Sequence, residues 1–133
     1  MGSLYTQPIS LFLGTDYTSV PFPYFQADGL TPKSLAGLAA RLMLRVNPGD
    51  QIPQVKITDA FSTFGQVLLG QNPNGGILQP MNGLVAFSLT QLGLQQIQDR
   101  SGIWALYLDA PGTPLTSVFL ASGTWSLCRT AIQ

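Results

Sequence analysis

The chain has 133 residues and a formal net charge of zero, with charged side chains making up 9% of residues against 45% hydrophobic ones. It contains no His and no Glu, the residues on which acid–base catalysis and zinc binding chiefly depend. This composition argues against an enzyme and predicts no cofactor and no metal. Its scattered Lys and Arg argue against binding to nucleic acid. So little surface charge favours contact with other protein.

The length predicts a single folded domain. We expect an extended segment over residues 1–8, followed by the folded domain over 9–133. The N-terminal segment has too few apolar residues to fold alone, so we expect a partner to order it. The sequence starts without the basic and apolar regions of a signal peptide, and it contains no apolar run as long as a membrane span. We therefore expect no membrane association.

The first strands are indicated by short alternating patterns. Residues 9–13 alternate until Gly14, and a second alternating segment covers 18–25. Pro21 and Pro23 remove two backbone donors from the same side of this segment, which predicts an edge strand. The Asp28-Gly29 pair then marks a turn.

The segment 35–46 can be interpreted in two ways. It is rich in Leu, Ala, Arg and Met, which favour a helix, but its apolar residues alternate from Ala40 to Val46. We favour a strand over 38–46, which the turn at 47–50 ends. Weaker strand patterns and a loop follow at 54–58, 67–69 and 70–76.

The second half of the chain predicts a strand, a short helix and three further strands. Residues 83–90 form an alternating strand with Val85 and Phe87 on one face. Thr90 is suited to cap a helix over 90–98, with Leu92 and either Leu94 or Ile97 turned inward. The remaining strands are expected at 103–108, 115–120 and 124–130, separated by turns at 109–114 and 122–123.

Seven to nine short strands with frequent turns predict an all-β fold, a single antiparallel immunoglobulin-like β-sandwich with one short helix near 90–98. The predicted core residues share the inward positions of the alternating segments. They are Leu11, Phe22, Leu42, Leu44, Val85, Phe87, Leu89, Trp104, Leu106 and Val118.

Several loose motifs recur in a definite order along the chain. Ala27-Asp28-Gly29 is followed by Leu35-Ala36-Gly37, and then come the strands at 40–45, 83–90 and 102–108. This order resembles the small β-sandwich domains of tailed-bacteriophage structural proteins, in particular the N-terminal domain of baseplate upper proteins and related tail proteins. Ala36 stands where a Thr is common in that family, and the segment 47–80 is longer and richer in Pro and Asn.

Candidate contact residues are aromatic or lie on one mixed strand face. Trp104, Trp125, Tyr107, Phe87 and Phe119 have strand spacing and are expected mostly in the core, with a sugar-binding platform as the alternative. The mixed face of the strand at 38–46 is either solvated or an inter-subunit contact. Our interface candidates are Tyr5, Tyr17, Phe22, Tyr24, Phe25, Arg41, Met43 and Arg45.

The remaining reactive side chains have structural interpretations. Cys128 lacks a His to activate it and is expected to be a core or interface residue. The Asp residues lie mostly near predicted turns, where they accept local backbone hydrogen bonds.

The resemblance implies a structural virion protein of the tail or baseplate, assembled in the host cytoplasm. It would associate with itself as a homo-oligomer and dock to other virion proteins. The alternatives are a carbohydrate- or receptor-binding sandwich and, among structural proteins, a head decoration or cement protein.

Overall fold

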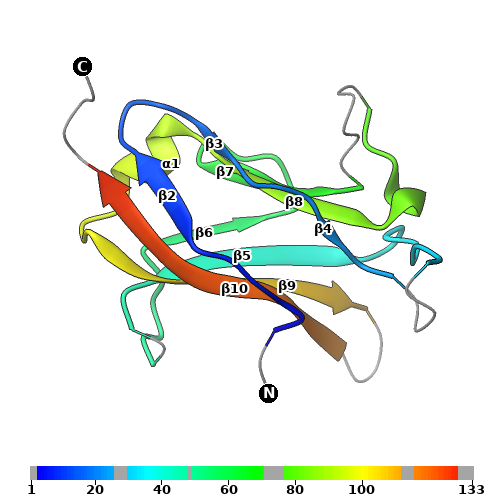
Figure 1. The fold of residues 1–133 in the computed structure, drawn as a ribbon. Helices are drawn as coiled ribbons and strands as arrows, with labels where there is room; N and C mark the ends of the chain where they lie inside the picture. Colours follow the sequence, from blue (N-terminus) through cyan, green and yellow to red (C-terminus); the bar gives the residue numbers. More distant parts are fainter. Residues whose placement is uncertain (1–2, 26–29, 48, 71–76, 112–115, 129–133) are drawn as a thin grey trace.

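Two β-sheets pack face to face in a computed structural model of the chain (Figure 1). The structure describes residues 3–25, 30–47, 49–70, 77–111 and 116–128. The predicted all-β class and the short helix are confirmed. The predicted turn at Asp28-Gly29 and nearly all of the predicted loop at 70–76 lie outside the described residues.

Sheet A has six strands in the order β1-β10-β9-β5-β6, with β2 also paired to β10. The first two strands, β1 and β2, run parallel to β10, with Tyr5 opposite Ala121 and Ile9 opposite Trp125. The N-terminal segment therefore contributes a strand to the sheet. The strands are β1 (Tyr5–Thr6), β2 (Ile9–Phe12), β5 (Ala39–Arg45), β6 (Val55–Thr58), β9 (Ser101–Ala110) and β10 (Thr116–Cys128).

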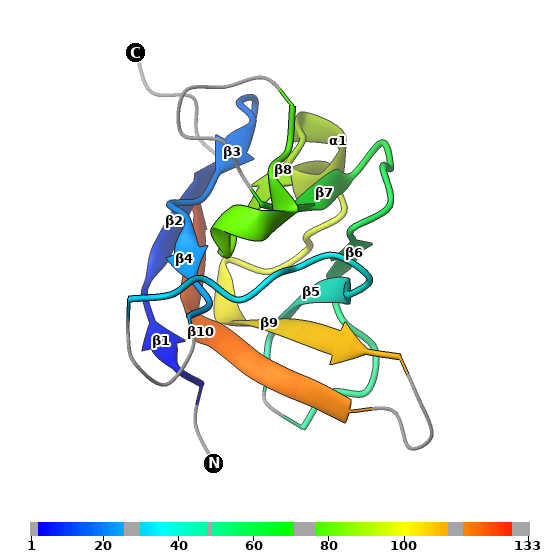
Figure 2. The same ribbon diagram turned by 90° about the vertical axis from the view of Figure 1, so that its right-hand side faces the viewer.

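Sheet B has four strands, with β8 at its centre, β3 and β4 along one side and β7 on the other. Figure 2 shows this sheet as a layer above β5, β9 and β10. The strands are β3 (Tyr17–Thr18), β4 (Phe22–Pro23), β7 (Gly65–Leu69) and β8 (Leu84–Leu89).

The predicted edge strand at 18–25 is confirmed, although it is split into β3 and β4. The Tyr24 N–H donates to the Gly83 oxygen across the pair with β8. Because consecutive N–H groups of a strand point to opposite sides and the Tyr24 N–H points to β8, Pro21 and Pro23 lack their donors on the side away from β8. Between the two short strands, the buried Ser19 hydroxyl accepts a hydrogen bond from the Phe87 N–H, which keeps this side of β8 paired.

The ambiguous segment 35–46 forms β5, so its alternation outweighs its helix propensity. Ala40, Leu42 and Leu44 point into the core from this strand. The turn after it is confirmed by a hydrogen bond from the Asp50 N–H to the Asn47 oxygen.

The core lies between the two sheets and contains nine of the ten predicted residues. Val118 is instead half-buried and packs against the core from its side. Phe22, Phe87 and Trp104 form its aromatic centre, with ring centroids 5.8 Å and 5.3 Å from Trp104. These three rings join sheet B to sheet A.

Helix α1 (Gln91–Gln95) closes one end of the sandwich. The Thr90 hydroxyl accepts from the Gly93 N–H and caps the helix, as predicted. Leu94 and Ile97 are buried, whereas Leu92 is 50% exposed, so its predicted inward position is wrong. A 3-10 turn, η1 (Pro80–Asn82), precedes β8. Within the described residues, no helix has the length and hydropathy required to cross a membrane.

The two strands predicted at 115–120 and 124–130 are one continuous strand, β10, so the turn predicted at 122–123 is wrong. A β-bulge between Phe119 and Ala121 places one residue more on β10 than on the paired part of β9. Gly123 is needed for close packing and not for a turn, because a Cβ there would lie 1.9 Å from the Gln7 oxygen. Residues 129–130 lie outside the described part.

Candidate interaction surfaces

The outer face of sheet A carries a three-layer stack. Arg41 on β5 and Phe119 on β10 both lie opposite Tyr107 on β9, one on each side. The Arg41 guanidinium lies 4.2 Å from the Tyr107 ring centroid, and the Phe119 ring lies 4.8 Å away at an interplanar angle of 16°. Both faces of the tyrosine ring are therefore covered by side chains of this chain. A sugar ring would have to displace one of them to stack on Tyr107.

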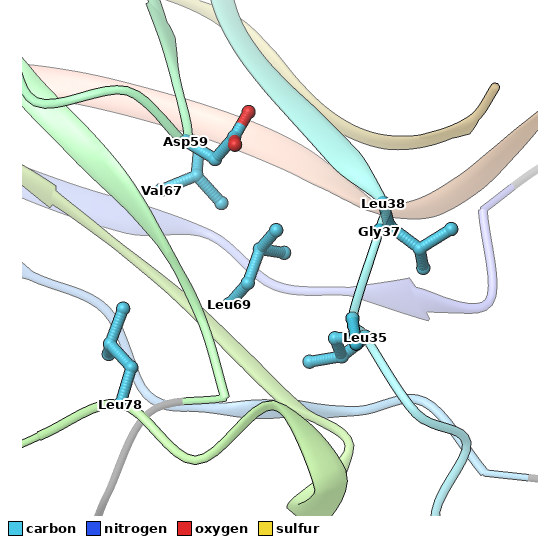
Figure 3. Close-up of a pocket in the computed structure, with 8 residues that line it drawn as sticks. Leu35, Gly37, Leu38, Asp59, Val67, Leu69 and Leu78 are labelled. Carbon is cyan, nitrogen blue, oxygen red and sulfur yellow. The ribbon is translucent and has the colours of Figure 1, made fainter.

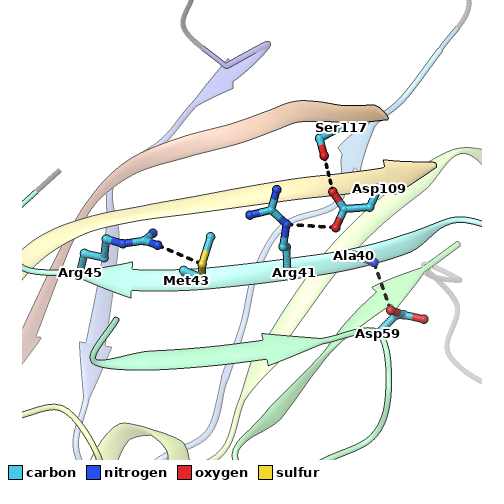
Figure 4. A network of polar contacts seen from close by, with 7 residues as sticks. All are labelled: Ala40, Arg41, Met43, Arg45, Asp59, Asp109 and Ser117. Atoms are coloured by element: carbon cyan, nitrogen blue, oxygen red, sulfur yellow. Dashed lines mark hydrogen bonds and ion pairs between the residues drawn. The ribbon is translucent and has the colours of Figure 1, made fainter. Parts of the chain in front are cut away.

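A polar network continues this face toward the end of β9 (Figure 4). Arg41 Nε donates to Asp109 Oδ2 at 3.0 Å, and the Ser117 hydroxyl donates to Asp109 Oδ1 at 2.6 Å. Partial burial by itself raises the pKa of the Asp109 carboxyl. The hydrogen bonds from Ser117 and Arg41, with the charges of Arg41 and Lys56, outweigh it and hold that pKa below its usual value. Asp109 lies in β9 and not in the predicted turn.

The other two candidates on β5 also contact their own neighbours. Met43 is 7% exposed, which is too little for a large contact with another subunit. Arg45 donates from Nη2 to Met43 Sδ at 3.2 Å and from Nε to the Asp50 oxygen at 2.7 Å. The structure thus brings Arg41, Met43 and Arg45 onto one face, as predicted, but intramolecular contacts occupy much of each side chain.

Phe22 is a core residue, and its selection as an interface candidate is wrong. It is 4% exposed and packs between Tyr5 and Trp104. Its position on the inner face of β4 follows from its register with Val85, which also points inward. Tyr5 is half-buried beside it, and its hydroxyl donates to the Pro23 oxygen at 2.6 Å.

The remaining aromatic candidates are half-buried and scattered. Tyr17 packs against Phe87 with centroids 6.0 Å apart, and burial raises the pKa of its hydroxyl. Tyr24 lies under the Lys33 ammonium group at 4.7 Å. Phe25 forms a backbone bridge with Pro32. These residues do not form one surface with the β5 candidates, which lie on the other sheet.

A small apolar groove of about 250 Å³ opens along the seam between the sheets (Figure 3). Leu35, Val67, Leu69 and Leu78 point into it. Asp59 lies at its margin, where one carboxylate oxygen accepts from the Ala40 N–H. The carboxylate is thus used to hold the start of β5, and the groove belongs to the packing of the two sheets.

The outer face of sheet B differs sharply from that of sheet A. The register places uncharged side chains at every outward position of the four strands. By contrast, Arg41, Arg45, Lys56 and Asp109 point outward from sheet A. The residues at outward positions of sheet B are Thr18, Pro23, Gln66, Leu68, Leu84, Ala86 and Ser88, of which Ala86 is fully buried.

A second groove, of about 350 Å³, lies on this uncharged face. Gln66, Leu68 and Ser88 line it, and the Phe61 side chain stands at its side with 82% of its surface exposed. None of these residues was among the sequence-based candidates. The signal that could have found them is the spacing of charge, since the sequence has no charged residue over 17–27 or over 60–98. These two stretches contain all four strands of sheet B.

Asp50 makes a local backbone contact of the predicted kind, because its Oδ2 accepts from the Asn47 N–H. Asp16 Oδ1 accepts instead from a residue distant in sequence, the Gln91 N–H at the start of α1. Among the described residues, no three side chains of the types that ligate metals come together. Cys128 is half-buried at the end of β10.

No protein-family model matches the chain, and a search of curated proteins finds no relative.

Proposed function

We propose that the chain is a structural protein of a tailed-bacteriophage virion, which acts by docking to itself and to other tail or baseplate proteins. The observation that carries this proposal is the uncharged outer face of sheet B. Exposed sheet surfaces of free-standing proteins normally carry charged side chains, which keep them soluble and apart. A face without them is suited to burial against another protein. The motif order described above supplies the phage context.

The proposed fold is immunoglobulin-like. The order β10-β9-β5-β6 in sheet A corresponds to strands G, F, C and C′ of a variable-type domain, and β4-β8-β7 in sheet B corresponds to B, E and D. The sequence has a single Cys, so it cannot form the intrachain disulfide that joins strands B and F in antibody domains. The contact of Phe22 with Trp104 joins the equivalent strands here.

A carbohydrate-binding module is the second candidate, supported by a shallow groove of about 400 Å³ on sheet A beside Tyr107 and Phe119. Carbohydrate binding is the weaker of the two candidate functions, because side chains of this chain already cover both faces of the Tyr107 ring. Its test is a glycan array, with the Tyr107→Ala variant as the control. Binding abolished by that substitution would favour this function over docking to protein.

The docking function is tested by following incorporation into particles. We expect the tagged chain to co-sediment with tail proteins in gradient-purified phage from cells that carry its gene. Replacing Leu68 with Arg on sheet B should reduce incorporation. Replacing the exposed Lys56 of sheet A with Gln should leave it unchanged. A chain that is absent from the particles would overturn the proposal.

A further inference from the structure

The turn between β6 and β7 presents the side chain of Phe61 as an apolar knob at the groove on sheet B. Among the described residues, Phe61 is the most exposed phenylalanine, with 82% of its area accessible. Burying a large aromatic ring contributes more to binding than most other contacts. An exposed phenylalanine next to an uncharged groove is therefore a candidate anchor.

The backbone around Phe61 is held by several hydrogen bonds. The Ser62 hydroxyl donates to the Gly65 oxygen and accepts from the Phe64 N–H, and the Gly65 N–H donates to the Ser62 oxygen. On the N-terminal side of Phe61, the Ala60 N–H donates to the Thr58 hydroxyl. A knob on such a turn loses little backbone freedom on binding, which favours affinity.

The groove next to the knob has uncharged walls. Thr18, Gln66 and Ser88 supply polar groups at its surface, and Leu68 supplies an apolar one. Its volume of about 350 Å³ gives room for an aromatic side chain. Phe61 itself forms one wall of the groove, so the same face carries an exposed ring and the space that the ring of a second copy can enter.

We propose that the outer face of sheet B is the contact between two copies of this chain, in which Phe61 of each copy enters the sheet B groove of the other. This inference rests on the proposed function and names the partner for that surface. A twofold axis lets the same patch serve both copies, and the contact closes on itself without forming a filament.

Charge favours sheet B over sheet A as the face that pairs two copies. In a twofold contact a residue near the axis meets its own copy, and like charges there are destabilising. The outer face of sheet A carries three cations, Arg41, Arg45 and Lys56, against one carboxylate, Asp109, so two such faces would repel each other. Pairing through sheet B opposes uncharged strands, and Thr18, Gln66 and Ser88 can exchange hydrogen bonds across the axis.

Sedimentation analysis of the full-length chain over a range of concentrations tests the proposal. We expect a monomer–dimer equilibrium, and Phe61→Ala should raise its dissociation constant at least tenfold. Ile52→Ala is the matched control, because Ile52 is 84% exposed but lies outside sheet B. It should leave the equilibrium unchanged. Circular dichroism of each variant separates a lost contact from a lost fold.

A charge exchange at Gln66 tests the twofold geometry. Gln66→Lys and Gln66→Asp should each weaken the dimer at low salt, because two like charges then face each other. An equimolar mixture of these two variants should recover dimers of mixed composition. An unchanged dimer in Phe61→Ala, or a mixture that does not recover, would overturn the proposed contact.

A monomer at all concentrations would also overturn the dimer. The docking function would stand in that case if the chain still enters phage particles. Absence from the particles combined with an intact dimer would instead overturn the proposed function and leave the contact in place.

Discussion

The indole N–H of Trp104 donates a 2.9 Å hydrogen bond to the carbonyl oxygen of Gln7. Trp104 is at the centre of the core and is 1% exposed, so its polar atom needs a partner inside the protein. The N-terminal segment supplies that partner and covers the side of the indole ring. The segment therefore completes the core of the domain.

Gly123 permits this arrangement, which leads to a first prediction. A Cβ at this position would lie 1.9 Å from the Gln7 oxygen and 2.9 Å from Trp104 Nε1. We expect Gly123→Ala to lower the free energy of unfolding by about 1–3 kcal/mol or more, because the backbone of β10 and the N-terminal segment must separate. Urea denaturation measures the loss. Gly49→Ala is the control, since a Cβ there meets nothing within 4 Å, and an equal effect of both substitutions would contradict the packing argument.

Deleting residues 1–8 should destabilise the domain. The deletion removes β1, the ring of Tyr5 that packs against Phe22, and the acceptor for Trp104. Exchanging the hydrogen bond from the indole N–H to Gln7 for one to water costs about 0.5–1.5 kcal/mol, and the loss of the Tyr5 contact adds to it. This outcome replaces the expectation that the segment depends on a partner for its order. Thermal melts of the truncated and full chains provide the comparison, and equal melting temperatures would show that the segment is dispensable.

Phe87→Ala should lower the free energy of unfolding by about 3–5 kcal/mol. The ring is fully buried and contacts both Tyr17 and Trp104, so its removal leaves a cavity between the sheets. Phe12→Ala is a suitable control, because that ring is 41% exposed on the outer face of β2. An unfolding midpoint that does not move in Phe87→Ala would contradict its position in the core.

Acid should remove the contribution of Asp109 to stability. Its pKa in the folded protein lies below the ordinary value of 3.8, so its stabilising effect is present above that value and is lost as pH falls through the folded pKa. Because the ion pair with Arg41 is partly exposed, we expect less than about 1 kcal/mol at neutral pH. Asp109→Asn should be less stable than the wild type at pH 7, and the difference should shrink below about pH 4. A difference that is constant with pH would exclude this linkage.

Period-two alternation predicted most strands and their inward faces, because each sheet has one face on the core. It identified Phe87 and Leu42 as core residues correctly. The prediction that Phe22 belongs to the core is correct, and the prediction that it contacts another subunit is wrong. An edge strand with two prolines indicates a free side of the backbone, but it does not reveal whether a side chain points inward.

The wrong turn in β10 and the stack of Tyr107 and Phe119, which was not predicted, have a common physical origin. Gly123 resembled a turn residue, and its actual role depends on the approach of Gln7, which is distant in sequence. The contact between Tyr107 and Phe119 likewise depends on the register of two strands across a bulge. Local sequence patterns do not specify such contacts. The sequence shows two stretches without charged residues. Only the strand order of the fold reveals that these stretches form one surface, the outer face of sheet B.

The parallel pairing of β1 and β2 with β10 sets an order of events during synthesis. Ile9 cannot pair with Trp125 until the ribosome has synthesised and released the chain as far as β10. At ordinary translation rates, the first two strands wait on the order of ten seconds for their partner. The hydrogen-bonding groups of the nascent N-terminus stay open to other chains during this interval. Folding of the complete sandwich therefore waits for β10, and slowing the elongation of the ribosome cannot help this domain to fold earlier.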